Sequence, residues 1–188
     1  ETGSVMSEEV MVRHCSPTLA GLKTGSMFSY PFANSNDLRN SVRHWNRLFF
    51  GKGLRVLPLC QRNGRALIYV FRPQKLCQDL QDSIASELLN RCGYCDKDPQ
   101  KCIRHLMKRL NEGDSFPHEV GLFLGYPPVD VQGFIENRAK NPKCVGHWKV
   151  YGDERAARKR FELYDKCTRI YCQQWAKEKN IERLTIAG

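Results

Sequence analysis

The stretch LRVLPLCQRNGRALIYVF, residues 54–71, decides the fold because it places a tight-turn signal between two runs of β-forming residues. Residues 54–59 and 65–71 are rich in leucine, valine, isoleucine and aromatic residues, a composition that favours strands. Asn63–Gly64 between them is typical of a two-residue hairpin turn. The sequence therefore predicts an antiparallel hairpin that turns at Asn63–Gly64.

Apolar residues at helical spacing predict helices on both sides of this hairpin. One helix begins at the Asn36–Asp37 cap and carries an inner stripe of Leu38, Val42, Trp45, Leu48 and Phe49. A long helix opens at Pro73 and ends near Gly93, and another starts at about Asp98. Residues 129–137 and the segment after the Asp153 cap complete the set.

Three further segments are interpreted as strands: residues 10–14, 120–124 and 148–151. Helices interspersed among strands favour a layered α/β fold. We therefore expect a single α/β domain over residues 6–188, with a mixed sheet of about five strands that includes the hairpin. Residues 1–5, ahead of Met6, are interpreted as a leftover of expression.

Composition narrows the class of protein. Hydrophobic residues make up 41% of the chain and charged residues 27%, which is typical of a globular protein. The apolar runs are far shorter than the roughly 18 residues of a membrane helix, so we expect no membrane association. Nine cysteines, an odd number, in a chain with long helical patterns favour reduced cytosolic thiols over a disulfide scaffold.

The chain is basic, with a formal net charge of +10. Between residues 138 and 183, thirteen lysines and arginines outnumber six acidic residues, so this segment carries +7 of the total. A basic surface favours acidic partners. A small anionic ligand, an acidic protein and nucleic acid all remain open.

Cys15 is the candidate catalytic residue. The predicted strand ends there, and Ser16 and Pro17 resemble the N-cap and first residue of a helix. Free N–H groups at a helix N-terminus stabilise a thiolate and also bind anions. The alternative is that Cys15 is a small buried residue in a tight turn.

The candidate ligand-binding residues are His14, Thr18, Lys23, Tyr126 and Tyr151. Tyr126 and Tyr151 leave the ends of predicted strands, as Cys15 does. Ligands of open α/β sheets gather at the carboxyl ends of parallel strands. If these strands are parallel, Cys15, Tyr126 and Tyr151 lie together at the edge of the sheet where the strands end, which we call the rim.

Other groups of histidine, cysteine and acidic residues give weaker evidence for a catalytic or metal site. His118 and Glu119 are adjacent, and adjacent residues of a strand face opposite sides. Cys92 and Cys95 could be drawn as a zinc site with Cys102 and His105, but this Cys-x-x-Cys falls at a helix end, so we predict no metal site. Cys144, His147, Cys167 and Cys172 lack a paired metal-ligand spacing.

The terminal helix carries a run of basic residues, Arg155, Arg158, Lys159 and Arg160. Such a run either holds a nucleic-acid backbone or forms a solvated helix face. Nearby acidic residues offset these charges and no base-reading motif accompanies them. We therefore expect nucleic-acid binding to be weak.

Three segments carry a resemblance to a known family: HCSPTLAGLKTGSMF (residues 14–28), HEVGLFLGYPPVDVQGFI (residues 118–135) and CVGHWKVYGD (residues 144–153). Together they resemble the Firmicutes family catalogued as domain of unknown function 3793. The resemblance implies a bacterial, anaerobic and cytosolic origin. Flavodoxin genes beside some members imply a link to redox or iron physiology, and a flavodoxin-like protein as an acidic partner.

Two functional hypotheses follow. In the first, the protein binds a small anionic ligand or cofactor at the rim with Cys15, Thr18 and Tyr126, with Cys15-dependent redox chemistry as an extension. In the second, a non-enzymatic module docks an acidic protein or nucleic acid on its basic C-terminal face. The sequence identifies no cofactor and no reaction.

Overall fold

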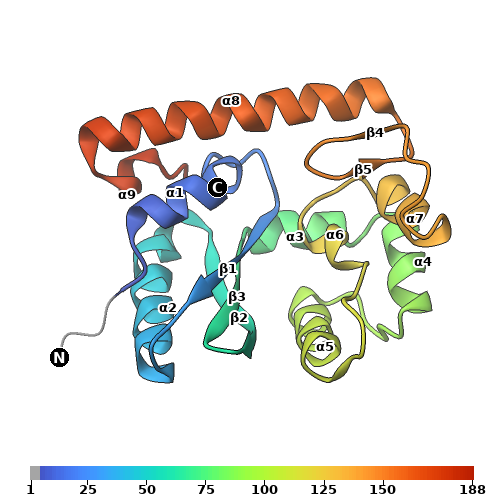
Figure 1. Ribbon diagram of the computed structural model, residues 1–188, viewed down its shortest axis with the longest axis horizontal. Coiled ribbons are helices and arrows are strands. Elements are labelled where there is room, and N and C mark those ends of the chain that lie inside the picture. The colour runs from blue at the N-terminus through green and yellow to red at the C-terminus, as the bar shows by residue number, and fades with distance from the viewer. Residues whose placement is uncertain (1–4) are drawn as a thin grey trace. The chain divides into compact units, whose positions relative to one another are not determined.

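The computed structural model describes residues 5–188, and their contacts divide into two compact units (Figure 1). The first unit runs to Pro73 and also contains Lys166–Gly188, while the second contains Gln74–Asp165. The prediction of one domain over residues 6–188 stays a prediction. Of residues 1–5, which are interpreted as a leftover of expression, only Val5 is among the described residues.

The first unit is built on a three-stranded antiparallel sheet of order β1-β3-β2. Its elements are α1 (Glu8–Leu19), β1 (Gly25–Pro31), α2 (Ser35–Phe49), the 3₁₀ helix η1 (Phe50–Lys52), β2 (Arg55–Arg62), β3 (Arg65–Phe71), the end of α8 (Glu154–Glu178) and α9 (Ile181–Leu184). β3 is the central strand and is buried along most of its length.

The predicted hairpin is confirmed. β2 pairs antiparallel with β3, and Arg62 faces Arg65 across the turn. Asn63 and Gly64 have φ angles of 51° and 70°, so both central residues adopt the left-handed conformation that a type I′ turn requires. Asparagine and glycine tolerate that conformation better than other residues, which is why this dipeptide fixes the turn.

The predicted mixed sheet of about five strands is wrong. Residues 5–188 form the three-stranded sheet and a separate two-stranded sheet of β4 (Cys144–Val145) and β5 (Lys149–Val150), and both are antiparallel. β1 escaped prediction because Gly25 and Pro31 resemble loop punctuation. Pro31 ends an edge strand, where the missing N–H removes little from the ladder.

The predicted strand over residues 10–14 is wrong, because this segment belongs to α1. The side chain of Ser7 caps the helix by accepting a hydrogen bond from the Val10 amide, 3.4 Å away. Glu8 and Glu9 in the first turn favour the helix dipole, and Glu9 forms an i,i+4 ion pair with Arg13. The helix therefore starts about eight residues before the predicted cap at Ser16.

The core of the first unit lies between one face of the sheet and the helices α1 and α2. Alternate residues of β3, Ala66, Ile68 and Val70, are fully buried there. The helices contribute Met11, Val12, Cys15, Leu19, Leu38, Trp45 and Phe49 to the same cluster. The unit is thus a two-layer arrangement in which amphipathic helices cover a sheet face.

Arg72, directly after β3, is buried and joins several parts of the first unit. Its guanidinium donates to the carbonyl oxygens of Thr18 and Leu19 at 2.8 and 2.9 Å, and to those of Lys52 and Ile186 at 3.3 and 2.7 Å. Carbonyls at the ends of α1 and η1 carry partial negative charge. Arg72 therefore holds these ends and the C-terminal segment together.

The second unit is mainly helical. It contains most of α3 (Pro73–Asp79), then α4 (Ser83–Arg91), α5 (Pro99–Glu112), α6 (Val120–Phe123), α7 (Pro128–Glu136), β4, β5 and the beginning of α8. The helices predicted near residues 98, 129–137 and 153 are confirmed. The long helix predicted from Pro73 is two helices, because the Asp82 side chain caps α4 by accepting from the Ile84 and Ala85 amides.

The strand predicted over residues 120–124 is also wrong, because this segment begins with the short helix α6. Glu119, only 1% exposed, precedes it and pairs with Arg109 of α5. The hydroxyl of Tyr94 also donates to Glu119, at 3.1 Å. These contacts fix the start of α6, and its continuous apolar sequence suits a buried helix as well as a strand.

Candidate ligand-binding site

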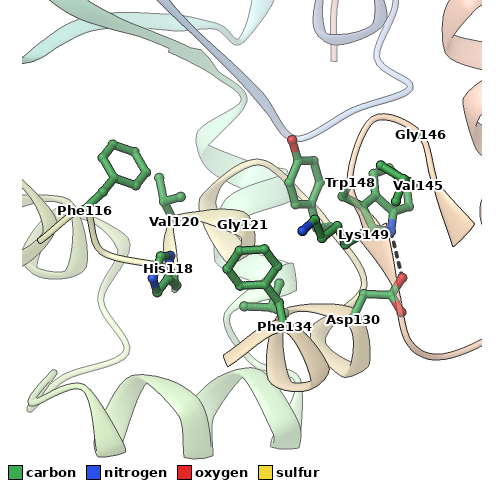
Figure 2. Close-up of a pocket in the computed structure, with 12 residues that line it drawn as sticks. Phe116, His118, Val120, Gly121, Asp130, Phe134, Val145, Gly146, Trp148 and Lys149 are labelled. Carbon is green, nitrogen blue, oxygen red and sulfur yellow. Dashed lines mark hydrogen bonds between the residues drawn. The ribbon is translucent and has the colours of Figure 1, made fainter. Parts of the chain in front are cut away.

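The second unit contains a pocket of about 300 Å³ that is mostly apolar. Its lining residues are Phe116, His118, Val120, Gly121, Tyr126, Asp130, Val131, Phe134, Val145, Gly146, Trp148 and Lys149. They come from the segment around α6, from α7 and from the β4–β5 hairpin. Figure 2 shows Phe116 and His118 on one side and Val145 and Trp148 on the other, with Phe134 between them.

Asp130 anchors one wall of this pocket. It is buried in α7, and its carboxylate accepts from the indole Nε1 of Trp148 at 2.7 Å. The same carboxylate accepts from the backbone amides of Tyr151 and Gly152 at 2.9 and 2.7 Å. One buried acid thus fixes both the end of β5 and the orientation of the indole ring (Figure 2).

Trp148 belongs to an aromatic cluster beneath the hairpin. Its ring is stacked on Tyr126, with centroids 4.9 Å apart, and meets Phe161 edge to face at 4.6 Å. The hydroxyl of Tyr126 donates to the His147 carbonyl at 3.3 Å. Burial, and then the neighbouring Tyr164, raise the pKa of Tyr126, so this phenol is neutral at physiological pH.

Gly121 allows Tyr126 to lie close to α6. A Cβ atom at position 121 would lie 2.8 Å from Cγ2 of Val131 and 3.0 Å from Cδ2 of Tyr126. Both distances are shorter than ordinary packing contacts, so any larger residue would move one of these side chains. The glycine therefore sets the shape of the pocket wall.

Two basic side chains, His118 and Lys149, also line the pocket. The His118 ring lies 5.1 Å from the Phe134 ring, and Nζ of Lys149 lies 5.9 Å from the centroid of the same ring. Lys149 donates to the Ala139 carbonyl at 2.9 Å. The pocket therefore combines aromatic walls with positive charge.

Two large apolar side chains of the lining are exposed at the mouth of the pocket. Phe116 is 54% exposed and Val145 is 64% exposed. Large side chains that are exposed beside an apolar cavity are typical of surfaces that contact a ligand or a partner.

Cys15 does not lie at a helix N-terminus, so the structural basis for a reactive thiol is wrong. It is fully buried within α1. Burial raises the pKa of its thiol to about 12, although Lys23 and a hydrogen bond to Ser26 act in the opposite direction. The alternative interpretation, a small buried residue, fits this position, although the residue lies in a helix and not in a turn.

The predicted rim is not formed by parallel strands, because the paired strands of residues 5–188 are antiparallel. Cys15 and Thr18 belong to the first unit, whereas Tyr126 and Tyr151 belong to the second. The argument that parallel strands bring these residues to one edge therefore fails.

Thr18 and Lys23 do lie near Cys15. The Thr18 hydroxyl is 2.8 Å from that of Ser26, and Ser26 also contacts the Cys15 thiol. Burial lowers the pKa of Lys23 to about 8, while the Cys15 thiolate would raise it. These residues form a polar cluster between α1 and β1.

His14 and Tyr151 make other contacts. The His14 ring stacks on Phe28 at 4.7 Å, and burial, followed by Arg13, lowers its pKa. The Tyr151 hydroxyl donates to the Lys140 carbonyl at 3.0 Å, and Tyr151 does not line the pocket. Of the predicted ligand-binding residues, Tyr126 is the one that lines it.

Sequence reasoning did not select Phe134, Trp148 or Lys149 as site residues. All three lie in the two segments, residues 118–135 and 144–153, that carry part of the family resemblance. That signal could have located the pocket. The cysteines and histidines of these segments suggest thiol or metal chemistry, whereas aromatic residues form much of the pocket wall.

In the part of the chain that the structure describes, no three His, Cys, Asp or Glu side chains lie close enough together to hold a metal ion. All nine cysteines are free thiols. The Cys102 thiol donates to the Asp96 carbonyl at 3.1 Å. Residues 5–188 also contain no helix with the length and apolarity to cross a membrane.

Comparison with known proteins identifies the family. Residues 11–185 match the family described as a protein of unknown function, DUF3793. No curated protein and no solved structure matches the chain. Because the match covers nearly the whole sequence, including every residue that lines the pocket, the chain belongs to the DUF3793 family.

Proposed function

We propose that the protein binds a small anionic ligand with a flat, apolar body in the pocket around Phe134 and Trp148. One observation carries this proposal: a single cavity combines aromatic walls with the basic side chains of His118 and Lys149. Ligand sites are typically apolar hollows with a few polar groups that orient the ligand. The net charge of +10 favours an anion.

The size and the walls of the pocket support a compact ligand. Its volume of about 300 Å³ lies at the small end of the range for ligand sites. Aromatic rings favour offset-stacked or edge-to-face contacts with other rings. The indole of Trp148 is held by Asp130, so this part of the wall is already oriented for binding.

The exposed apolar mouth also supports binding. Phe116 and Val145 expose apolar surface to water, at a cost of about 25 cal/mol for each Å². A ligand that covers these side chains would recover part of that free energy. The mouth would therefore contribute to affinity without contributing specificity.

A fluorescent probe can test this proposal. The naphthalene sulfonate ANS is an aromatic anion whose emission rises in apolar surroundings, and we expect it to bind the purified protein saturably at one site. Val120→Trp places a large ring in the pocket and should weaken binding at least tenfold. Leu163→Trp adds the same ring on the exposed side of α8 and is the matched control.

The comparison between these variants decides the result. If both retain wild-type circular dichroism and only Val120→Trp loses the probe, the pocket is the binding site. Equal binding to the wild-type protein and to Val120→Trp would contradict the proposal, because the probe would then occupy another surface.

A second candidate function rests on a different observation. Arg155, Lys159 and Arg160 are exposed on α8, while Arg158 is paired with Glu154. An exposed cluster of positive charges favours binding to an acidic macromolecule. One such partner is an acidic flavodoxin-like protein, which the family resemblance implies. In this function the protein is a docking module and the pocket has no role.

Salt dependence tests the second candidate. If α8 binds an acidic partner or nucleic acid, affinity should fall steeply as salt rises. Replacing Arg155, Lys159 and Arg160 with alanine should flatten that dependence. Submicromolar binding of a defined oligonucleotide at physiological salt, abolished by these changes and retained by Val120→Trp, would favour docking over ligand binding. We expect only weak binding that does not depend on base sequence.

A further inference from the structure

Lys149 is the basic group best placed to contact a ligand inside the pocket. It follows the turn of the β4–β5 hairpin and its side chain is half-buried. Nζ lies 5.9 Å from the centroid of the Phe134 ring, close to the centre of the lining in Figure 2. A ring stacked in the pocket would therefore lie beside this ammonium group.

The ammonium group retains hydrogen-bonding capacity. It donates one hydrogen bond, to the Ala139 carbonyl at 2.9 Å, and a lysine ammonium carries three donors. The Ala139 bond fixes the direction of the side chain while leaving two N–H groups for a ligand. The Lys149 side chain is thus oriented by one hydrogen bond, while its ammonium group can still donate to a ligand.

Within residues 5–188, the ammonium group of Lys149 forms no ion pair. Asp130, the one acidic residue among the described residues of the lining, uses both oxygens to accept from Trp148 and from backbone amides. Among residues 5–188, the ion pairs include neither Lys149 nor His118. Charges attract more strongly beside apolar walls than in water, so this ammonium favours an anionic ligand group.

The number and type of basic groups limit the anion. Phosphate sites commonly use arginine forks, helix N-termini or glycine-rich loops. The lining residues that the structure describes include no arginine, and their two basic groups are Lys149 and, at the exposed mouth, His118. A single ammonium matches a monoanion better than a doubly charged phosphate.

We infer that the ligand is an aromatic carboxylate whose ring packs between Phe134 and Trp148 and whose carboxylate accepts hydrogen bonds from Lys149. His118 lies beside the same Phe134 ring and can donate to the carboxylate from the mouth. This inference rests on the proposed function and adds the chemical class of the ligand.

A pair of probes with the same shape and different charge tests the inference. We propose calorimetric titration with 2-naphthoate and its neutral amide, 2-naphthamide. The wild-type protein should bind the carboxylate about tenfold or more tightly than the amide, as a charge-assisted hydrogen bond allows. Lys149→Gln should reduce this ratio to below about threefold, because the carboxylate loses its charged partner.

Two further variants separate charge from structure. Lys149→Arg keeps the positive charge and should keep a clear preference for the carboxylate. Lys140→Gln removes an exposed lysine of the same unit that does not line the pocket, and should behave as the wild-type protein.

The outcomes distinguish the inference from the proposed function. Equal affinity of the wild-type protein for 2-naphthoate and 2-naphthamide would overturn the carboxylate inference and leave the pocket as a binding site. A preference that survives in Lys149→Gln would overturn the role of Lys149. If the wild-type protein binds neither naphthalene probe nor ANS, the proposed function fails as well.

Discussion

The indole Nε1 of Trp148 donates a 2.7 Å hydrogen bond to the buried carboxylate of Asp130, and this contact joins the β4–β5 hairpin to α7. The two residues are 18 positions apart, yet they form one corner of the aromatic pocket. The carboxylate also accepts from the backbone amides of Tyr151 and Gly152, so both of its oxygens bind residues of the hairpin and of the segment directly after it. The orientation of the pocket wall therefore depends on Asp130.

Replacing Asp130 with asparagine should disturb both stability and binding. The amide has only one oxygen, so its NH₂ group would face either the indole N–H or the backbone amides. We expect a loss of about 2–3 kcal/mol in the free energy of unfolding, measured with urea. ANS binding should weaken in parallel. Asp114→Asn, at an exposed position, is the control, and equal stability of the two variants would contradict the role of Asp130.

Gly121→Ala should narrow the pocket. The new methyl group would contact Val131 and Tyr126 at distances that force one of them to move. We expect a destabilisation of about 1–3 kcal/mol, typical of overpacking, together with weaker probe binding. Gly51→Ala is a matched control, because a Cβ there meets no atom within 4 Å. Identical ANS titrations for wild type and Gly121→Ala would show that the wall is not shaped by this glycine.

Cys15 should be among the slowest of the nine cysteines to react with iodoacetamide in the native protein. Its pKa, raised by burial to about 12 from an ordinary 9.0, keeps the thiol protonated up to strongly alkaline pH. At pH 8 the thiolate fraction is therefore about a thousandfold below that of an ordinary thiol. Peptide mapping can compare it with the exposed Cys77 and Cys95. Rapid labelling of Cys15 at pH 8 would restore the reactive-thiol hypothesis.

Arg72 should be essential for the stability of the first unit. Arg72→Met would leave the carbonyls of Thr18, Leu19, Lys52 and Ile186 without their charged donor. Since these groups are largely buried, we expect a loss of about 3–5 kcal/mol in the free energy of unfolding. Arg39→Met, on the exposed side of α2, should cost less than about 1 kcal/mol. Similar urea midpoints for the two variants would exclude this role of Arg72.

Local signals predicted the elements whose residues favour a single conformation. The Asn63–Gly64 turn has few alternatives, and Asp153 caps its helix as predicted. The helix predicted from about Asp98 also starts there, with the Asp98 side chain as its N-cap. In contrast, residues 10–14 and 120–124 are short segments, each with several apolar residues, that suit either a strand or a helix. The Ser7 cap decides the first, and the buried contact of Glu119 with Arg109 decides the second. The cap was readable from the sequence, but the Arg109 contact depends on tertiary structure.

The pocket was harder to predict than the elements. Its walls come from residues 116–149, which tertiary contacts bring together. One of these contacts is the hydrogen bond between Asp130 and Trp148, which no spacing rule indicates. Phe134 and Trp148 also resemble ordinary core residues in the sequence. Tyr126 was identified from its position after a predicted strand, and it lines the pocket although that strand is a helix.

The most direct test of the central claim is native mass spectrometry of the protein purified without oxygen from its own host, in wild-type and Val120→Trp forms. We predict a one-to-one adduct of a small aromatic acid on the wild-type protein that dissociates on denaturation. The adduct should be absent from Val120→Trp, because the new ring occupies the pocket around Phe134. An adduct of equal abundance on both forms, or a wild-type protein that carries only nucleic acid or an acidic protein, would contradict the account.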